Sequence, residues 1–267
     1  MASIVQDIPV SSASTNDDRF FVRGAILMTI IIVAGFSTQY LMGRSTFMAP
    51  PLVHAHAFIF MGWVAIYLTQ NLLIGSGRVD IHRKLGWIAV GWIFPMVLLG
   101  CLVTLAMVRR GQAPFFFRPL QFLVFDPILV FTFAGLTIAA VTQRHRTDWH
   151  RRLHFCAMSL LLGPAFGRLL PMPLLQPWAW ETIFVVSLIF PVVGILRDMR
   201  RSGRAHPAWR YGIAAMLVSA VLTEAITYSP VGTALYRVVT AGSAGAAVPP
   251  LDFGTPPPMA GPVTGRS

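Results

Sequence analysis

Residues 85–108 read LGWIAVGWIFPMVLLGCLVTLAMV, an apolar stretch without a charged side chain. About 20 such residues in a helix cross the roughly 30 Å hydrocarbon core of a bilayer. The stretch therefore predicts a transmembrane helix. Working outward, six more segments have this character, and the seven predicted spans cover residues 22–42, 52–74, 85–108, 119–142, 153–172, 179–197 and 210–228. The predicted fold class is an all-α polytopic bundle of seven transmembrane helices.

The composition of the whole chain supports this class. Of the 267 residues, 55% are hydrophobic and only 12% are charged, and the mean hydropathy is +0.65. A soluble domain carries about 25% charged residues, so an ordinary soluble enzyme and a disordered chain are both excluded. The net charge of +11 comes from basic residues in short loops between apolar runs. We therefore expect the lipid bilayer as partner and no nucleic acid.

The basic residues also predict the orientation. Fourteen Lys and Arg residues fall in the N-terminal arm and the loops after the second, fourth and sixth spans, against six on the other side. The positive-inside bias places the first side in the cytoplasm. We therefore expect a disordered cytoplasmic arm over 1–20, a membrane domain over 21–228, and a flexible Gly/Pro-rich extracytoplasmic tail over 229–267.

A short motif occurs twice, as RVDIHRKL over 78–85 and as RTDWHRRL over 146–153. Both copies read R-x-D-x-H-R-[KR]-L and both precede a predicted span, which predicts a duplicated helical hairpin made of spans 2–3 and 4–5. One interpretation is structural, with the Asp complementing the helix dipole and the Arg residues contacting headgroups. Another pairs His82 with His150 or His154 as ligands of haem or a divalent metal at the inner face. A third assigns the loops to contacts with a partner.

Ionisable groups inside spans are costly and often functional. Six such groups fall toward the outer face by alternating topology: His54, His56, Asp126, Arg168, Glu181 and Glu224. Three carboxylates and one arginine in one pocket imply a protonated carboxyl, a cationic histidine or a bound cation. The alternatives are that Glu181 complements a helix dipole and that Arg168 and Glu224 extend to water. His54 and His56 point about 200° apart on a regular helix, so a joint metal site requires an irregular segment.

The run from His54 through Gln70 to RVDIHRKLG, residues 78–86, resembles a pattern in uncharacterised bacterial multi-pass membrane proteins. In those proteins a helix with an early His and a late Gln precedes an H-R-x-L-G sequence. The resemblance covers residues 54–86 together with the second motif copy. It implies a bacterial inner-membrane location, and it implies no activity.

Three functional hypotheses follow. The first is a binding or transport protein whose outward-facing cavity uses the six outer residues for a proton, a cation or a small polar solute. The second is a haem- or metal-binding redox protein using the inner histidines, and the third is a non-catalytic assembly or sensor protein. The sequence contains no G-x-S-x-G, P-loop or H-E-x-x-H motif, so it does not decide whether the protein is an enzyme.

Overall fold

A computed structural model describes residues 12–43 and 48–255, and every regular element in those ranges is helical. Six helices are long and apolar enough to cross a membrane: α1, α2, α3, α4, α7 and α8. The bundle therefore has the character of an integral membrane protein in contact with lipid. The elements are α1 (Ser12–Leu41), α2 (Pro51–Gly75), α3 (Val79–Arg109), α4 (Pro119–Thr142), α5 (Thr147–Leu160), α6 (Gly163–Leu169), η1 (Met172–Leu175), α7 (Ala179–Ser202), α8 (Pro207–Thr227), α9 (Pro230–Thr240) and η2 (Ala244–Ala247).

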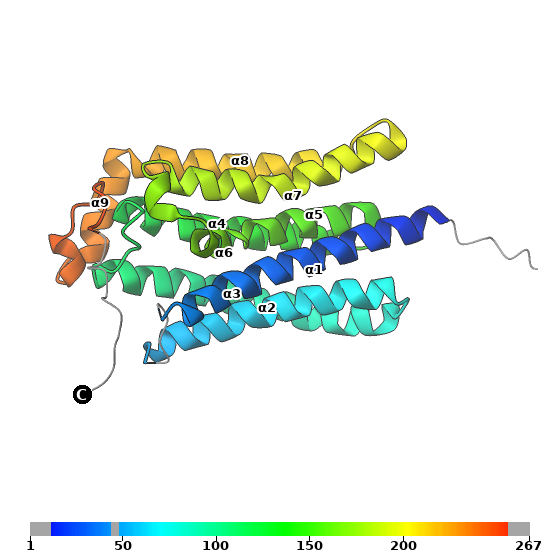
Figure 1. The fold of residues 1–267 in the computed structure, drawn as a ribbon, viewed down its shortest axis with the longest axis horizontal. Helices are drawn as coiled ribbons and strands as arrows, with labels where there is room; N and C mark the ends of the chain where they lie inside the picture. Colours follow the sequence, from blue (N-terminus) through cyan, green and yellow to red (C-terminus); the bar gives the residue numbers. More distant parts are fainter. Residues whose placement is uncertain (1–11, 44–47, 256–267) are drawn as a thin grey trace, which may run out of the picture.

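The long helices lie side by side and alternate in direction, so that α1 begins at one end of the bundle and α9 lies at the other (Figure 1). The end at which α1 begins also carries the loops 76–78, 143–146 and 203–206, and we name it the basic end. The opposite end carries the loops 110–118 and 170–178 and α9. Along the chain, α2 packs on α3, α3 on α4, and α4 on α5.

Helix boundaries follow from proline and glycine. A proline stands in the first turn of α2, α4, α8 and α9, where its fixed φ suits the helix and its missing N–H costs nothing. Gly203 ends α7 with φ 70°, a left-handed conformation that other residues avoid. These local rules place the helix ends close to the predicted span ends.

The fifth predicted span, 153–172, is not one continuous helix. It is divided into α5, which ends at Leu160, and α6, which begins at Gly163. Pro164 has no N–H to continue the ladder, and its ring would clash with the carbonyl of Leu160 in an unbroken helix. Helix α6 is seen nearly end-on in Figure 1, so it lies across the direction of the long helices. It packs against α1.

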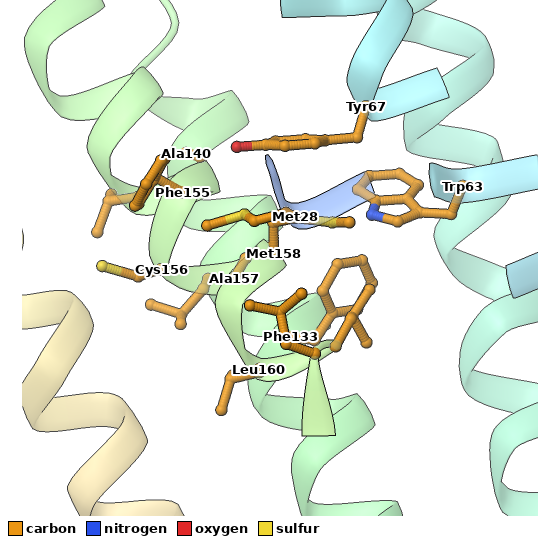
Figure 2. Packing of buried hydrophobic residues seen from close by; sticks show 14 of the residues in the cluster. Met28, Trp63, Tyr67, Phe133, Ala140, Phe155, Cys156, Ala157, Met158 and Leu160 are labelled. Atoms are coloured by element: carbon orange, nitrogen blue, oxygen red, sulfur yellow. The ribbon is translucent and has the colours of Figure 1, made fainter. Parts of the chain in front are cut away.

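The core is built from large side chains where α1, α2, α4 and α5 meet. Trp63 of α2 lies edge-on to Phe133 of α4, with ring centroids 5.0 Å apart. Figure 2 shows Trp63 and Tyr67 reaching from α2 toward this region, with Met28 of α1 beside them. Met28 and Phe133 are fully buried, so this layer fixes the spacing of the four helices around it.

Both flanks of the membrane domain contain more structure than we expected. Helix α1 begins at Ser12 rather than at residue 22, because Asp17 pairs with Arg151 of α5 and with Arg197 and Arg201 of α7. These partners offset the cost of ordering a polar segment that composition alone assigns to a disordered arm. Residues 1–11 lie outside the described ranges.

The C-terminal flank, expected as a flexible tail, is folded over 230–255. The Tyr236 hydroxyl lies 3.2 Å from the carbonyl oxygens of Gly245 and Val248, and Leu120 N–H donates to the Pro250 carbonyl at 2.8 Å. These partners come from a neighbouring turn and from α4. Composition cannot reveal them, and it therefore favoured disorder. Residues 256–267 lie outside the described ranges.

Candidate functional site

The two copies of the R-x-D-x-H-R-[KR]-L motif occupy equivalent helix positions. Arg78 immediately precedes α3 and Arg146 immediately precedes α5, so each motif histidine falls in the first turn and a half of its helix. The rings of His82 and His150 meet with centroids 6.1 Å apart and planes at 89°. His154, one turn further along α5, has its centroid 4.7 Å from that of His150. Three imidazoles therefore gather between α3 and α5 near the basic end.

These histidines line a cavity of about 130 Å³ between α1, α2, α3, α4 and α5. Its apolar walls include Phe21, Ile66 and Val90. Its polar side chains come from all five helices and are Asp18, Trp63, Tyr67, Gln70, Asn71, His82, Thr137, His150, Arg151 and His154. The cavity thus combines a mostly apolar surface with several hydrogen-bonding groups, which is the usual character of a small-molecule site.

The cavity wall holds polar atoms that are not satisfied by the protein. Nine side-chain N or O atoms are buried without a hydrogen-bond partner in the described part of the chain. Five of them belong to side chains that line this cavity: Trp63 Nε1, Gln70 Oε1, His82 Nδ1, Thr137 Oγ1 and Arg151 Nε. A buried polar atom left unpaired costs about 1–3 kcal/mol. All five atoms are themselves inaccessible to solvent, so they lie behind the cavity surface rather than on it.

His150 is held in one tautomer by the main chain. Its Nδ1 lies 2.8 Å from the carbonyl oxygen of Ala140, and a carbonyl only accepts, so Nδ1–H is the donor. In the neutral ring, Nε2 is then left as an acceptor. The imidazole cluster therefore offers at least one oriented acceptor.

The haem and metal hypothesis can be tested against this geometry. Among residues 16–43 and 48–255, no group of three or more His, Cys, Asp or Glu side chains is placed to hold a metal ion. For haem, the decisive quantity is the volume of the cavity, which is about 130 Å³. An apolar cavity of about 150 Å³ accommodates benzene, and a macrocycle of four pyrrole rings is several times larger. The three histidines therefore do not fit haem in this arrangement.

An ionic network surrounds the cavity at the basic end. Asp18 and Arg151 both line the cavity and pair at 3.7 Å. Arg151 also pairs with Asp17 at 2.7 Å, and Asp17 reaches Arg197 at 2.5 Å. These contacts attach the start of α1 to α5 and α7. Sequence reasoning missed them because it placed both aspartates in a disordered arm.

A second, more buried ion pair joins α5 to α7. Arg152 donates to both carboxylate oxygens of Asp198, at 2.9 and 3.0 Å, and Trp209 Nε1–H donates to the same carboxylate at 2.8 Å. His206 follows in the α7–α8 loop, and partial burial together with Arg152 lowers its pKa. A neutral His206 suits its role, since its Nδ1 accepts from the Ala208 N–H. The signal in the sequence was an Asp directly after the predicted sixth span, next to Arg197.

Five of the six outer residues fall into two groups. In the first, Arg168 of α6 lies within electrostatic range of His56 of α2 and of Asp126 of α4. The Thr104 hydroxyl of α3 donates to Asp126, and the Arg168 guanidinium lies 4.2 Å from the centre of the Phe36 ring. The break in the fifth span places Arg168 on the short transverse helix, within electrostatic range of Asp126.

The second outer group surrounds Glu224. Gln121 Nε2 donates to Glu224 Oε1 at 3.0 Å, and Glu181 interacts electrostatically with Glu224 and Arg118. The Arg118 guanidinium also lies over the Tyr228 ring. Partial burial raises the pKa of Tyr228, and the positive charge of Arg118 acts in the opposite direction. His54 is exposed on α2, whereas His56 is half-buried. Arg118 was not among the predicted site residues, since it falls between two spans.

No family model, curated protein or solved structure matches the chain. The functional argument therefore rests on the geometry of the cavity and of the two outer groups.

Proposed function

We propose that the protein is an integral membrane protein that binds a small solute in the histidine-lined cavity near the basic end. The observation that carries this proposal is the gathering of three imidazoles from two helices on the wall of one largely apolar cavity. The Ala140 carbonyl orients the His150 ring, which leaves Nε2 as an acceptor. Such a cavity suits a small solute that carries a polar group, and a binding or transport role follows.

We further infer that the chain crosses a bacterial inner membrane seven times, with α5 and α6 together forming a broken fifth span. The basic end is cytoplasmic by the excess of Lys and Arg, and α9 is extracytoplasmic. The start of α1 and the position of α9 at opposite ends support an odd number of crossings. The equivalent placement of Arg78 and Arg146 before α3 and α5 supports a duplicated hairpin.

Chemical modification tests whether solutes reach the cavity. Diethylpyrocarbonate modifies neutral imidazoles, and peptide mapping by mass spectrometry assigns each rate to one histidine. His145 is exposed in the α4–α5 loop and serves as the internal reference. We expect His82 and His150 to react in the purified protein. Unreactive His82 and His150 beside a fully modified His145 would contradict the proposal.

A cavity-filling variant sharpens the test. Gly86 lines the cavity, and a Cβ placed there meets only Gln70 Nε2, at 3.6 Å. Gly86→Leu is therefore expected to fold and to slow modification of His82 by about tenfold or more, because the added side chain occupies space in the cavity that His82 lines. The matched control is Gly91→Leu on the same helix, where an added Cβ meets nothing within 4 Å. Equal slowing in both variants would show that the reagent does not reach His82 through the cavity.

The outer group of His56, Asp126 and Arg168 supports a second candidate function, a proton or cation site in an outward-facing cavity. The observation that favours it is the electrostatic interaction of Arg168 on α6 with both Asp126 of α4 and His56 of α2. Asp126→Asn is expected to abolish pH-linked flux into dye-loaded proteoliposomes, because the amide cannot exchange a proton. Asp80→Asn, at the exposed start of α3, is the control. Unchanged flux in Asp126→Asn removes Asp126 from the mechanism.

A further inference from the structure

We propose that the first copy of the repeated motif forms a binding site for an anionic phospholipid at the start of α3. The site consists of the exposed side chains of Arg83, Lys84, Trp87 and Arg144, and we name it the α3 basic face. None of these four residues lines the histidine-lined cavity, so the proposal does not depend on what that cavity binds. It rests on the two motif copies, on the contact between Arg144 and Trp87, and on the apolar surface that follows along α3.

The two motif copies differ in the partners of their basic residues. In the second copy, the two arginines that follow the histidine pair with Asp17 of α1 at 2.7 Å and with Asp198 of α7 at 2.9 Å. Their equivalents in the first copy are Arg83 and Lys84, which are exposed and form no ion pair within the described part of the chain. The second copy is therefore neutralised by carboxylates of this chain, whereas the first is open to an anion from outside.

Helix packing explains why the first copy stays open. Helix α5 packs on α7 and α8 and contacts α1, and these contacts supply the carboxylates of the second copy. Helix α3 packs on α2 and α4, and at its other end on α9 and η2. His82 lines the cavity, and at 3.6 residues per turn Lys84 lies roughly 200° around the helix from it. The motif thus directs its histidine into the bundle and its basic residues toward the outside.

Arg144 brings a third cation to the same place from the α4–α5 loop. Its guanidinium lies 6.0 Å from the centre of the Trp87 ring, and Trp87 stands one turn after Arg83 and Lys84. Tryptophan favours the headgroup depth of a bilayer, and guanidinium and ammonium groups donate readily to a phosphate at that depth. Asp80, one turn before Lys84, is exposed and unpaired within the same described residues, so the face keeps a net positive charge.

The surface that continues along α3 suits acyl chains. Trp87 is 66% exposed and Phe94 is 73% exposed. Helices that pack together in a membrane approach through small residues, so bulky exposed rings favour a lipid over a second helix. The exposed side chains recur every three or four residues and so share one side of the helix. They are Trp87, Ile88, Phe94, Leu98 and Leu102.

Native mass spectrometry of the detergent-purified protein tests the lipid class, because it resolves individual bound phospholipids and yields their affinities. Phosphatidylglycerol and phosphatidylcholine with the same acyl chains differ in the charge of their headgroups. We expect phosphatidylglycerol to bind at least about tenfold more tightly, since each nearby cation attracts an anionic lipid. Equal affinity for the two lipids overturns the proposal. Glycerol 3-phosphate, which lacks chains, is expected to bind more weakly than phosphatidylglycerol, and equally tight binding would indicate a site for free phosphate instead.

A triple variant locates the lipid on the α3 basic face. Replacing all three cations, as Arg83→Gln with Lys84→Gln and Arg144→Gln, is expected to reduce the preference for phosphatidylglycerol by about tenfold. These side chains are exposed, so the variant is expected to unfold in SDS at the same concentration as the unmodified protein. An unchanged lipid preference in the folded variant overturns the proposal.

The matched control removes the same charge from the same end of the bundle. Arg200, Arg204 and Arg210 lie around the α7–α8 turn, are exposed, and likewise form no ion pair in the ranges that the structure describes. Their joint replacement by Gln is expected to retain the preference for phosphatidylglycerol. Equal losses in the two triple variants would assign the preference to overall charge and not to a site at α3, and would overturn the proposal.

Discussion

Asp198→Ala is expected to lower the free energy of unfolding by about 3–5 kcal/mol, because it leaves a buried guanidinium with only the exposed carboxylate of Asp148 as counter-charge. Arg152 and Asp198 have side chains only 6% and 7% exposed and join through two hydrogen bonds. The substitution also removes the acceptor of the buried Trp209 indole N–H. Titration of the detergent-solubilised protein with SDS, followed by tryptophan fluorescence, measures the change.

The matched control uses another aspartate that pairs with the same arginine. Asp148 contacts Arg152 at 3.3 Å, but its side chain is 55% exposed, so Asp148→Ala is expected to cost no more than about 1 kcal/mol. Replacing both members of the buried pair, as Arg152→Met with Asp198→Leu, is expected to restore much of the loss, since neither charge then remains unpaired. Equal losses for Asp198→Ala and Asp148→Ala would show that burial of the pair contributes nothing.

Gly35→Leu is expected to destabilise the protein by about 1–3 kcal/mol and to displace α6. A Cβ at Gly35 would lie 2.8 Å from the Ala165 carbonyl oxygen and 3.0 Å from its Cα. These are backbone atoms of α6, so the helix itself must move. Arg168 then moves away from Asp126, because it is carried on α6. The unfolding free energy in SDS measures the first effect.

A double-mutant cycle measures the second effect, the displacement of α6 that moves Arg168 away from Asp126. If Gly35→Leu already separates Arg168 from Asp126, adding Asp126→Asn has a smaller effect than it has alone, and the two are not additive. Gly91→Leu is the control for the Gly-to-Leu change in an apolar helix, since nothing lies within 4 Å of its added Cβ. Strict additivity of Gly35→Leu and Asp126→Asn would contradict the role of α1 packing in positioning Arg168.

Much of the bundle could be predicted because apolar length is a local property of the sequence. Helix α4 has the predicted bounds 119–142, and α2 and α7 begin within one residue of their predicted starts. The prolines in the first turns of α2 and α4 mark their starts directly. The exception is the fifth span, in which Pro164 divides the helix. The proline was visible, but proline also lies inside α3, α4 and α7 without dividing them.

The candidate sites were less predictable, because they depend on partners far away in the chain. The repeated motif singled out His82 and His150, and these rings lie 6.1 Å apart. Nothing in the motif indicated that Trp63, Gln70 and Thr137 join them around one cavity. The outer residues were grouped by depth alone, and the structure divides them between Asp126 and Glu224.

The sequence by itself determined that the chain is a helical membrane protein, where α2, α4 and α7 begin, and which motif places a histidine in the first turns of α3 and α5. Each of these follows from residues adjacent in the chain, through apolar length, proline and the spacing of the motif. The tertiary structure alone decided that Asp17 binds the arginines of α5 and α7, that α6 holds Arg168 within electrostatic range of Asp126, and that three histidines line one cavity. These features arise from the packing of helices distant in sequence, where the partner of each polar group is set by geometry and not by its neighbours along the chain.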